Sequence, residues 1–333
     1  MRGGGYLLNA PNQAYSKNFL LFGYGYTGIG KNLGVNIGDH IQTISVANII
    51  KKLYPSLNCK FWDRDNLSNY NGEKAFTVMQ GWFSFEHCYS FMPNCNILPV
   101  FIGTHFTENT QEKIIRFMEE NPDYFKNKVI GCRDNFTKEF FKSAGFEAYL
   151  SRCLTLTLPK RQSASGQDKI FMVDIPNEWL KYFPQNIVKD AVFKNQRSLD
   201  PNKNDGYYYN STDIYMQKAK EQLEMYKNQG KLVITTCLHC AAPCVAMGVP
   251  TVLIVNNSAD CRYSALKGIL KIYSINDLIN KNIDFSPEIL DIEELKSDMI
   301  KNVELSIKQE LGEEINIDEL KSIRNKIEEF SII

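Results

Sequence analysis

The chain has 333 residues, of which 44% are hydrophobic and 23% charged, a composition typical of globular proteins that excludes a disordered chain. Lys plus Arg equal Asp plus Glu at 38 each, which excludes a general electrostatic attraction to nucleic acid or to an anionic membrane. We find no apolar run of about 20 residues for a membrane span, and no signal-peptide pattern. We therefore expect a cytoplasmic protein, with peripheral association at the inner face of the membrane as the alternative.

In the first half of the chain, apolar runs of strand length alternate with amphipathic stretches of helix length. This alternation is typical of βαβ units around a mostly parallel sheet. We expect strands at 19–22, 59–62, 75–79, 97–102 and 128–130, and helices at 39–53, 110–120 and 135–143. The polar stretch 158–168, which contains Pro, Ser and Gly, is predicted to link two domains, residues 1–160 and 168–333.

The second half contains another series of the same kind. We expect strands at 169–173, 187–193, 231–235 and 251–255, helices at 212–228 and 239–247, and two charged helices at 292–311 and 317–330. The predicted fold class is α/β, with two Rossmann-like domains facing across a cleft, similar to the GT-B glycosyltransferase architecture. Such folds bind ligands at the carboxyl ends of the strands.

Two glycine-containing segments come early in the chain. Gly23, Gly25 and Gly28 form a G-x-G-x-x-G pattern, but no helix opens inside it and no acidic residue ends a second strand 20 residues on. We expect a glycine loop there rather than a dinucleotide site. In Asn36-Ile-Gly-Asp39, Asp39 is predicted either to cap the first helix or, with Asn36, to face a ligand.

His239 follows an apolar strand at the point where the chain turns into a helix, with Thr236 beside it. An imidazole at this position can transfer a proton near neutral pH. Cys237, Cys240 and Cys244 surround it with a spacing that also suits a metal, but no second Cys/His pair completes such a site. We therefore expect small packing residues, no metal, and a catalytic His239. The nine cysteines of the chain are expected to be reduced thiols.

Polar residues follow two other predicted strands. Arg133 and Asp134 come after the strand at 128–130, where a guanidinium can bind a carboxylate or phosphate and Asp134 can cap the next helix or act as a base. The alternative is an Arg–Asp pair that only braces a loop. Asn256 and Arg262 follow the strand at 251–255 and add polar groups at the same strand ends.

Several motifs together resemble the polysaccharide pyruvyl transferase family, and their order and spacing cover about residues 34–270. They are Asn36-Ile-Gly-Asp39 with Gln42, Gln80-Gly-Trp82, Phe101-Ile-Gly-Thr-His105, Gly131-Cys-Arg-Asp134 with Thr137 and Gly145, and Val233 to Pro250. The resemblance implies transfer of a pyruvyl group from phosphoenolpyruvate to two hydroxyls of a sugar in a bacterial surface polysaccharide or its lipid-linked precursor. The products are a cyclic ketal and phosphate, and no cofactor or metal is needed.

The resemblance also implies roles for individual residues. His239, Arg133 and Asp134 are the expected catalytic residues. The donor is expected to bind at Arg262, Thr236, Leu238 and Asn256, and the acceptor sugar at Asn36, Asp39, Trp82 and His105. The family usually reads Arg-Leu-His where this chain has Cys237-Leu-His239, and a thiol replaces neither the charge nor the fork of an arginine. Either Arg262, Lys231 or Arg161 compensates, or the donor is not phosphoenolpyruvate. The alternatives are a glycosyltransferase-like enzyme that uses a nucleotide sugar, and a non-catalytic glycan-binding relative.

Overall fold

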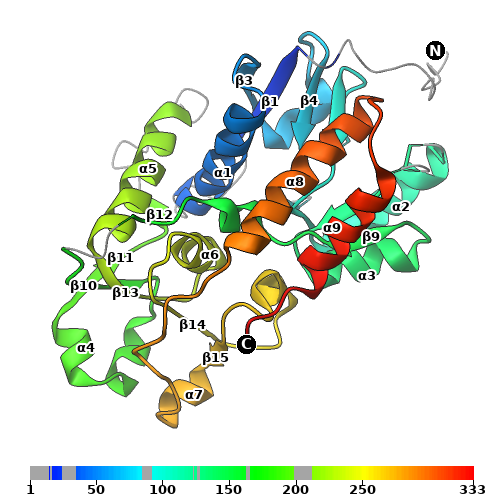
Figure 1. Ribbon diagram of the computed structural model, residues 1–333. Helices are drawn as coiled ribbons and strands as arrows, with labels where there is room; N and C mark the ends of the chain where they lie inside the picture. The colour runs from blue at the N-terminus through cyan, green and yellow to red at the C-terminus, as the bar shows by residue number, and fades with distance from the viewer. Residues whose placement is uncertain are drawn as a thin grey trace, which may run out of the picture. The chain divides into compact units, whose positions relative to one another are not determined.

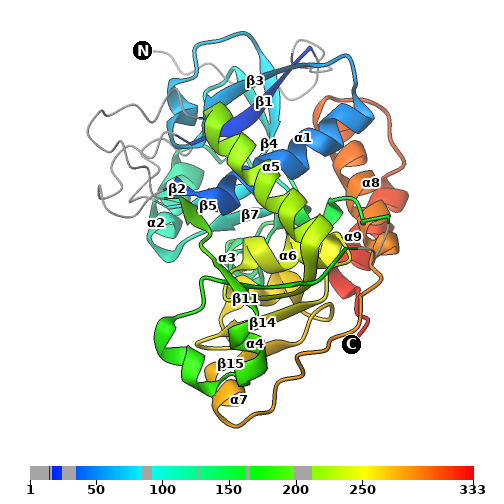
Figure 2. The same ribbon diagram turned by 90° about the vertical axis from the view of Figure 1, so that its left-hand side faces the viewer.

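A computed structural model describes residues 15, 17–24, 35–84, 92–122, 124–125, 128–162, 166–198 and 212–333 (Figures 1 and 2). The chain divides into two compact units. The first unit consists of residues 1–28, 49–152 and 298–329, and the second of residues 29–48, 153–297 and 330–333. Each unit therefore takes in segments from distant parts of the sequence, unlike the two continuous segments that we expected.

The first unit is built on parallel strands. Its strands are β1 (Asn18–Gly23), β3 (Asn58–Asp63), β4 (Ala75–Val78), β5 (Gly81–Phe83), β6 (Ile97–Val100), β7 (Thr104–Phe106), β8 (Ile130–Cys132) and β9 (Ala148–Leu150). Its helices are α2 (Glu108–Glu120), α3 (Asn135–Ser143), α9 (Ile317–Glu329), the short η2 (Arg64–Asn69), and parts of α1 (Ile37–Leu53) and α8 (Glu293–Glu310), which the division between the units crosses.

Two four-stranded sheets in this unit, ordered β3-β1-β4-β6 and β5-β7-β8-β9, are joined by a kink. Val78 pairs with Val100 before the kink, and Gly81 pairs with Thr104 after it. The segment that leads from β6 to β7 therefore has one more residue at the kink than the segment that leads from β4 to β5. Such a bulge bends a strand and redirects its side chains. Gly103 sits at the bend with φ +70°, a conformation that favours glycine, and its backbone lies against the Gln80 side chain.

The second unit contains one five-stranded parallel sheet in the order β11-β10-β13-β14-β15. The strands are β10 (Lys169–Val173), β11 (Ala191–Lys194), β13 (Gly230–Thr235), β14 (Thr251–Val255) and β15 (Ile272–Ser274), and β2 (Val35–Asn36) and β12 (Arg197–Ser198) form a separate antiparallel pair. The helices are α4 (Gln185–Lys189), α5 (Thr212–Gln229), α6 (Leu238–Ala246), α7 (Ile275–Ile279) and the short η3 (Leu154–Thr157), η4 (Asn177–Tyr182) and η6 (Cys261–Leu266).

Helices cover both faces of this sheet. Figures 1 and 2 show α4 and α7 on one side of the strands and α5 and α6 on the other. On the first side, Trp179 and Phe183 pack with Ile234 and Ile254 in one buried cluster. On the other side Tyr226 of α5 lies against Phe171, with ring centroids 5.3 Å apart. The sheet is buried on both faces, which explains its almost uninterrupted apolar strands.

The predicted fold class is confirmed as α/β with parallel sheets, and most predicted elements lie within two residues of the observed ones. One strand prediction is shifted and another is wrong. The strand expected at 128–130 lies at 130–132, and Lys128 before it forms an ion pair with Glu310. The segment 187–193 begins in α4, which Pro184 initiates, and only its end is a strand. Among the described residues, no helix has the length and apolar content to cross a membrane.

Candidate active site

The turn from β13 to α6 presents a continuous run of half-buried residues. Thr236, Cys237, Leu238 and His239 are partly accessible, whereas the end of β13 before them and the helix after them are buried. Leu238 and His239 lie in the first turn of α6, so their backbone N–H groups belong to the electropositive end of a helix. Within this segment, the residues that solvent reaches are therefore those at the carboxyl end of β13, where a parallel sheet places ligands.

A proline inside α6 explains how the backbone at His239 is held. Pro243 has no N–H group, so the carbonyl of His239, four residues earlier, receives no helical hydrogen bond from it. The side-chain amide of Gln196 donates to that carbonyl instead, at 3.1 Å. The backbone carbonyl of the buried Gln196 also accepts from the N–H of Ile37, at 2.8 Å. Gln196 therefore links the first turn of α6 to the start of α1.

The start of α1 lies directly against His239. A side-chain carbon added to Gly38 would be 2.8 Å from His239 Cβ and 3.1 Å from its Nδ1, so only glycine fits without displacing the imidazole. Asn36 caps this helix, because its side-chain oxygen accepts from the N–H of Gly38 at 3.0 Å. The prediction that Asp39 is the cap is therefore wrong. Asp39 is buried within the first turn, where its carboxylate accepts from Gln42 at 3.2 Å.

A carboxylate lies next to Cys237. Asp174 follows β10 with φ +52°, and its carboxylate accepts from the N–H of Gln196 and from the thiol of Cys237, the latter at 3.1 Å. Burial raises the pKa of the Cys237 thiol, and the charge and hydrogen bond of Asp174 raise it further. The sulfur at this position is therefore a protonated hydrogen-bond donor at neutral pH.

The other predicted donor ligands lie after β14. Asn256 is exposed, and the exposed Arg262 directs its fork at Asp260, with Nη2 2.6 Å from the carboxylate. Tyr263 fixes this segment to the turn, because its hydroxyl donates to the carbonyl of Thr236 at 2.9 Å. An anion bound by Arg262 thus has to share the guanidinium with Asp260. Arg161 donates to the carbonyl of Gly230 at 2.8 Å, and Lys231 is exposed.

A second group of predicted residues lies on neighbouring strands of the first unit. His105 on β7 is hydrogen-bonded through Nδ1 to the carboxylate of Asp134, at 2.5 Å, and both side chains are buried. Asp134 also caps α3 by accepting from the N–H of Thr137 at 3.0 Å. Burial raises the pKa of Asp134, but the hydrogen bond and charge of His105, with the charge of Arg133, lower it more, so its net pKa is depressed.

Arg133 combines burial with available donors. Its side chain is 5% exposed, and its Nε lies 3.7 Å from Asp134. Within the described part of the chain, this Nε makes no hydrogen bond. A buried guanidinium with a distant carboxylate partner can donate to an anionic ligand.

Trp82 lies beside His105. The two residues are paired across β5 and β7, with ring centroids 6.4 Å apart. Trp82 also lines an open hollow together with Ser84, Thr107, Glu108, Asn109 and Glu112. An indole face beside polar groups is a surface on which a sugar ring can stack. The predicted acceptor residues are thereby divided between the units: Trp82 and His105 belong to the first, and Asn36 and Asp39 belong with His239 to the second.

The cysteine motif packs the interior of α6. Cys240 and Cys244 are completely buried, and burial raises the pKa of Cys240 well above its usual value. Among the residues that the structure describes, no three His, Cys, Asp or Glu side chains are placed to hold a metal ion. The glycine loop predicted at Gly25 and Gly28 lies outside the described residues.

Sequence reasoning missed four residues of the His239 site. They are Asp174, Gln196, Gly38 as a contact of His239, and Tyr263. One of them, Asp174, left a signal, because it directly follows a predicted strand. Pro243, four residues after His239, also implies an outside donor for the carbonyl of His239. Nothing in the local sequence identifies Gln196 as that donor.

Two α/β units with polar side chains at the carboxyl ends of parallel strands define a Rossmann-like fold class. A family model described as polysaccharide pyruvyl transferase matches residues 36–258, about two thirds of the chain, and the protein belongs to this family. The match begins at the cap of α1, ends after β14, and includes both histidines but neither Arg262 nor Tyr263. No curated protein matches the sequence. Family membership indicates a transferase of polysaccharide biosynthesis.

Proposed function

We propose that the protein transfers the pyruvyl group of phosphoenolpyruvate to two hydroxyls of a sugar and forms a cyclic ketal. The observation that carries this proposal is His239, a half-buried imidazole in the first turn of α6, packed against Gly38 within the segment that matches the family. The acceptor we propose is a sugar of a bacterial surface polysaccharide or of its lipid-linked precursor, processed in the cytoplasm.

The chemistry requires proton transfer in both directions. The methylene carbon of the donor gains one proton, which makes the neighbouring carbon electrophilic. The two sugar hydroxyls add to that carbon in turn and lose two protons, and the C–O bond to phosphate breaks. One proton stays on the new methyl group, and the other leaves with hydrogen phosphate. An imidazole is suited to this exchange because its pKa lies near neutrality.

On the donor side, we assign the proton transfer to the methylene carbon to His239. The backbone N–H of Leu238 lies at the same turn and suits an oxygen atom of a phosphate. The hydroxyl of Thr236 donates to the carbonyl of Asp174 at 3.1 Å and must release it to bind the phosphate. Asn256 and Arg262 follow the neighbouring strand and supply further donors, and Asp260 must release part of the Arg262 fork. The donor side needs neither a metal nor another cofactor.

On the acceptor side, we assign His105 and Asp134 to removal of a hydroxyl proton. Asp134 holds one ring nitrogen of His105 and stabilises the imidazolium that forms, as a carboxylate does in a catalytic triad. Trp82, paired with His105, is proposed to stack on the sugar ring. We assign to Arg133 the binding of a carboxylate or phosphate oxygen.

The direct test is release of inorganic phosphate from phosphoenolpyruvate. We expect release that depends on an added glycan acceptor, together with an increase in acceptor mass that corresponds to a ketal. Phosphoenolpyruvate should also raise the melting temperature. Phosphate release that does not depend on any acceptor, or an acceptor of unchanged mass, would contradict pyruvyl transfer.

One observation favours a second candidate, a glycosyltransferase-like enzyme with a nucleotide-sugar donor. Next to His239 the structure places a thiol hydrogen-bonded to the carboxylate of Asp174, an arrangement without positive charge. Stabilisation by nucleotide sugars, without any by phosphoenolpyruvate, would support this candidate. Cys237→Arg separates the two: a guanidinium there should lower the KM for phosphoenolpyruvate, whereas Cys237→Ser should not.

A further inference from the structure

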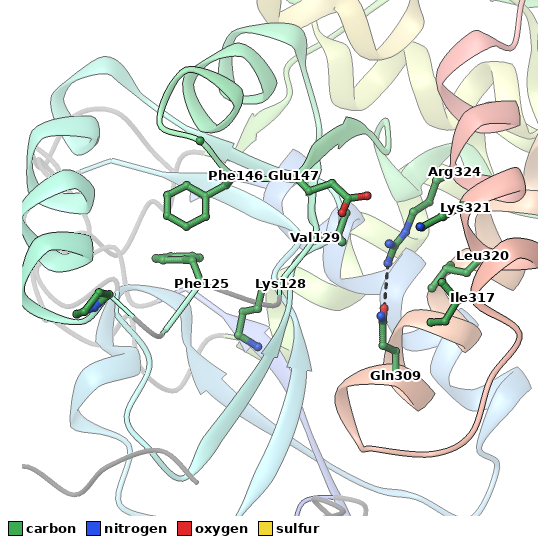
Figure 3. Close-up of a pocket in the computed structure, with 12 residues that line it drawn as sticks. Phe125, Lys128, Val129, Phe146, Glu147, Gln309, Ile317, Leu320, Lys321 and Arg324 are labelled. Carbon is green, nitrogen blue, oxygen red and sulfur yellow. Dashed lines mark hydrogen bonds between the residues drawn. The ribbon is translucent and has the colours of Figure 1, made fainter. Parts of the chain in front are cut away.

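A pocket of about 490 Å³ lies in the first unit, away from the residues assigned to either histidine site (Figure 3). Its walls come from three parts of the chain: the segment after α2, the turn between α3 and β9, and the facing sides of α8 and α9. Its volume is within the range of small-molecule sites. Neither the proposed reaction nor the family motifs account for it.

The pocket contains a buried arginine whose hydrogen-bond partners are all neutral. Arg324 of α9 is 7% exposed. Its guanidinium donates to Asn302 at 3.4 Å, to Ser306 at 3.1 Å and to Gln309 at 3.4 Å, the last of which is drawn in Figure 3. It also lies 5.1 Å from the centre of the Tyr149 ring. Among the described residues, no carboxylate lies within ion-pair distance of it.

Two other buried cations among the described residues have a carboxylate partner, whereas the buried Arg152 donates to the backbone carbonyls of Ile327 and Glu328. Arg64 donates to Asp65 at 2.9 Å, and the ammonium of Lys296 lies 2.5 Å from Glu293. A cation removed from water without a counter-ion carries an uncompensated desolvation cost. Neutral amides and hydroxyls offset only part of that cost. Arg324 therefore differs from Arg64 and Lys296 in lacking an anion, and it lies at the wall of a cavity.

The remaining pocket surface suits an apolar body attached to an anionic group. Phe125, Phe146 and Leu320 supply apolar walls, and Lys321 adds a second cation at the exposed rim. Lys128 also lines the pocket, but it is already paired with Glu310 at 2.6 Å. Figure 3 shows the carboxylate of Glu147 on the same side of the pocket as Arg324, although the two are not within ion-pair distance.

We propose that this pocket binds a small organic anion. Its carboxylate or phosphate group contacts Arg324 and Lys321, and its apolar body packs between Phe125, Phe146 and Leu320. Glu147 is the one carboxylate that lines the described pocket, and its charge opposes the bound anion. The proposal is independent of the transfer reaction, because the residues that carry it take no part in either histidine site.

The experiment is a titration of the full-length protein with four probes, followed through the methyl resonances of Ile317 and Leu320. Benzoate and phenyl phosphate carry the two anionic groups, benzyl alcohol is the neutral counterpart of similar shape, and inorganic phosphate lacks the apolar body. We expect saturable shifts with benzoate or phenyl phosphate, and responses at least about tenfold weaker with benzyl alcohol and with inorganic phosphate. The methyl resonance of Ile279, on α7, is the internal control and should not move.

Three variants and one control variant test which residues bind the anion. Arg324→Gln should weaken anion binding about tenfold or more, and Lys321→Gln about threefold. Glu147→Gln should strengthen it about threefold, because a repelling charge is removed. Lys326→Gln, an exposed lysine of the same helix outside the pocket, is the matched control and should leave the affinity unchanged.

Two results would overturn the proposal. One is an equal response to benzoate and benzyl alcohol, and the other is wild-type anion affinity in Arg324→Gln. Since Arg324 belongs to a buried hydrogen-bond network, its variant must first show a cooperative melting transition. If Arg324→Gln does not fold, the proposal is tested with Lys321→Gln and Glu147→Gln. Wild-type anion affinity in both of these variants would also reject the site.

Discussion

The two histidine sites of this protein are held in place by different forces. In the first unit, His105 is buried and bonded to the carboxylate of Asp134, so charge orients its ring. In the second unit, His239 is half-buried, and its backbone and Cβ are fixed by Gln196 and by close approach to Gly38. A site oriented by charge depends on pH and on a single carboxylate. A site oriented by packing depends on the volume of its neighbours.

The largest effect is expected for His239→Gln. If His239 protonates the donor, turnover should fall about 10²–10⁴-fold, the usual contribution of a general acid or base. The melting temperature should change little, because the side chain is half-buried and its neighbours are held by backbone contacts. Phosphate-release kinetics and thermal melting measure the two effects. Near-normal turnover would remove His239 from the mechanism.

Asp134→Asn tests the charge-oriented site. The variant keeps the shape but removes the charge bonded to His105, and we expect a loss of about 2–3 kcal/mol in the free energy of unfolding at pH 7. The folded-state pKa of Asp134 is depressed, so its stabilisation is present above the unfolded pKa of about 3.9 and is lost as pH falls through the folded value.

Urea denaturation of both proteins at a series of pH values measures this dependence. The difference in stability between wild type and Asp134→Asn should be largest near neutrality and should shrink in acid. A difference that stays constant from pH 7 to about pH 3 would show that the carboxylate charge does not stabilise the fold.

Gly38→Ala tests the packing-oriented site. The added methyl group meets His239 Cβ at 2.8 Å, and relief of this overlap should cost about 1–3 kcal/mol and displace the imidazole. Gly81→Ala is the matched control, since its nearest contact, the Arg64 side chain, is at 3.4 Å. Denaturation and turnover should both distinguish the two variants. Equal stability and equal turnover in the two variants would mean that the position of the His239 side chain does not depend on the close approach of α1.

The smallest effect is expected at Cys237. Because burial and Asp174 raise the pKa of its thiol, the reactive thiolate is scarce at pH 8. Iodoacetamide should therefore modify Cys237 more slowly than the exposed Cys95, as peptide mass spectrometry can measure. Cys237→Ser keeps a donor for Asp174 and should change stability by less than about 1 kcal/mol. Faster modification of Cys237 than of Cys95 would contradict the assigned hydrogen bond.

The local sequence predicted much of the fold and the position of both sites. Apolar periodicity located β10, β14 and α3 to the residue, because buried strands and amphipathic helices leave a pattern along the chain itself. Four strands of three residues, β5, β7, β9 and β15, were not predicted, since three residues are too few to show a period. Two of these strands carry Trp82 and His105.

Only the tertiary structure decided which residues meet. The hydrogen bond from Gln196 to His239 and that from Cys237 to Asp174 join residues 43 and 63 positions apart, and Tyr149 meets Asn302 across 153. Residues 298–329 pack within the first unit, although they follow every strand of the second. Sequence patterns report the face that an element buries, whereas the partner on that face depends on how all elements pack together. The sequence by itself therefore determined the fold class, the family motifs and the strand end at His239. Packing alone decided that Gly38, Gln196 and Asp174 surround that histidine and its neighbouring thiol.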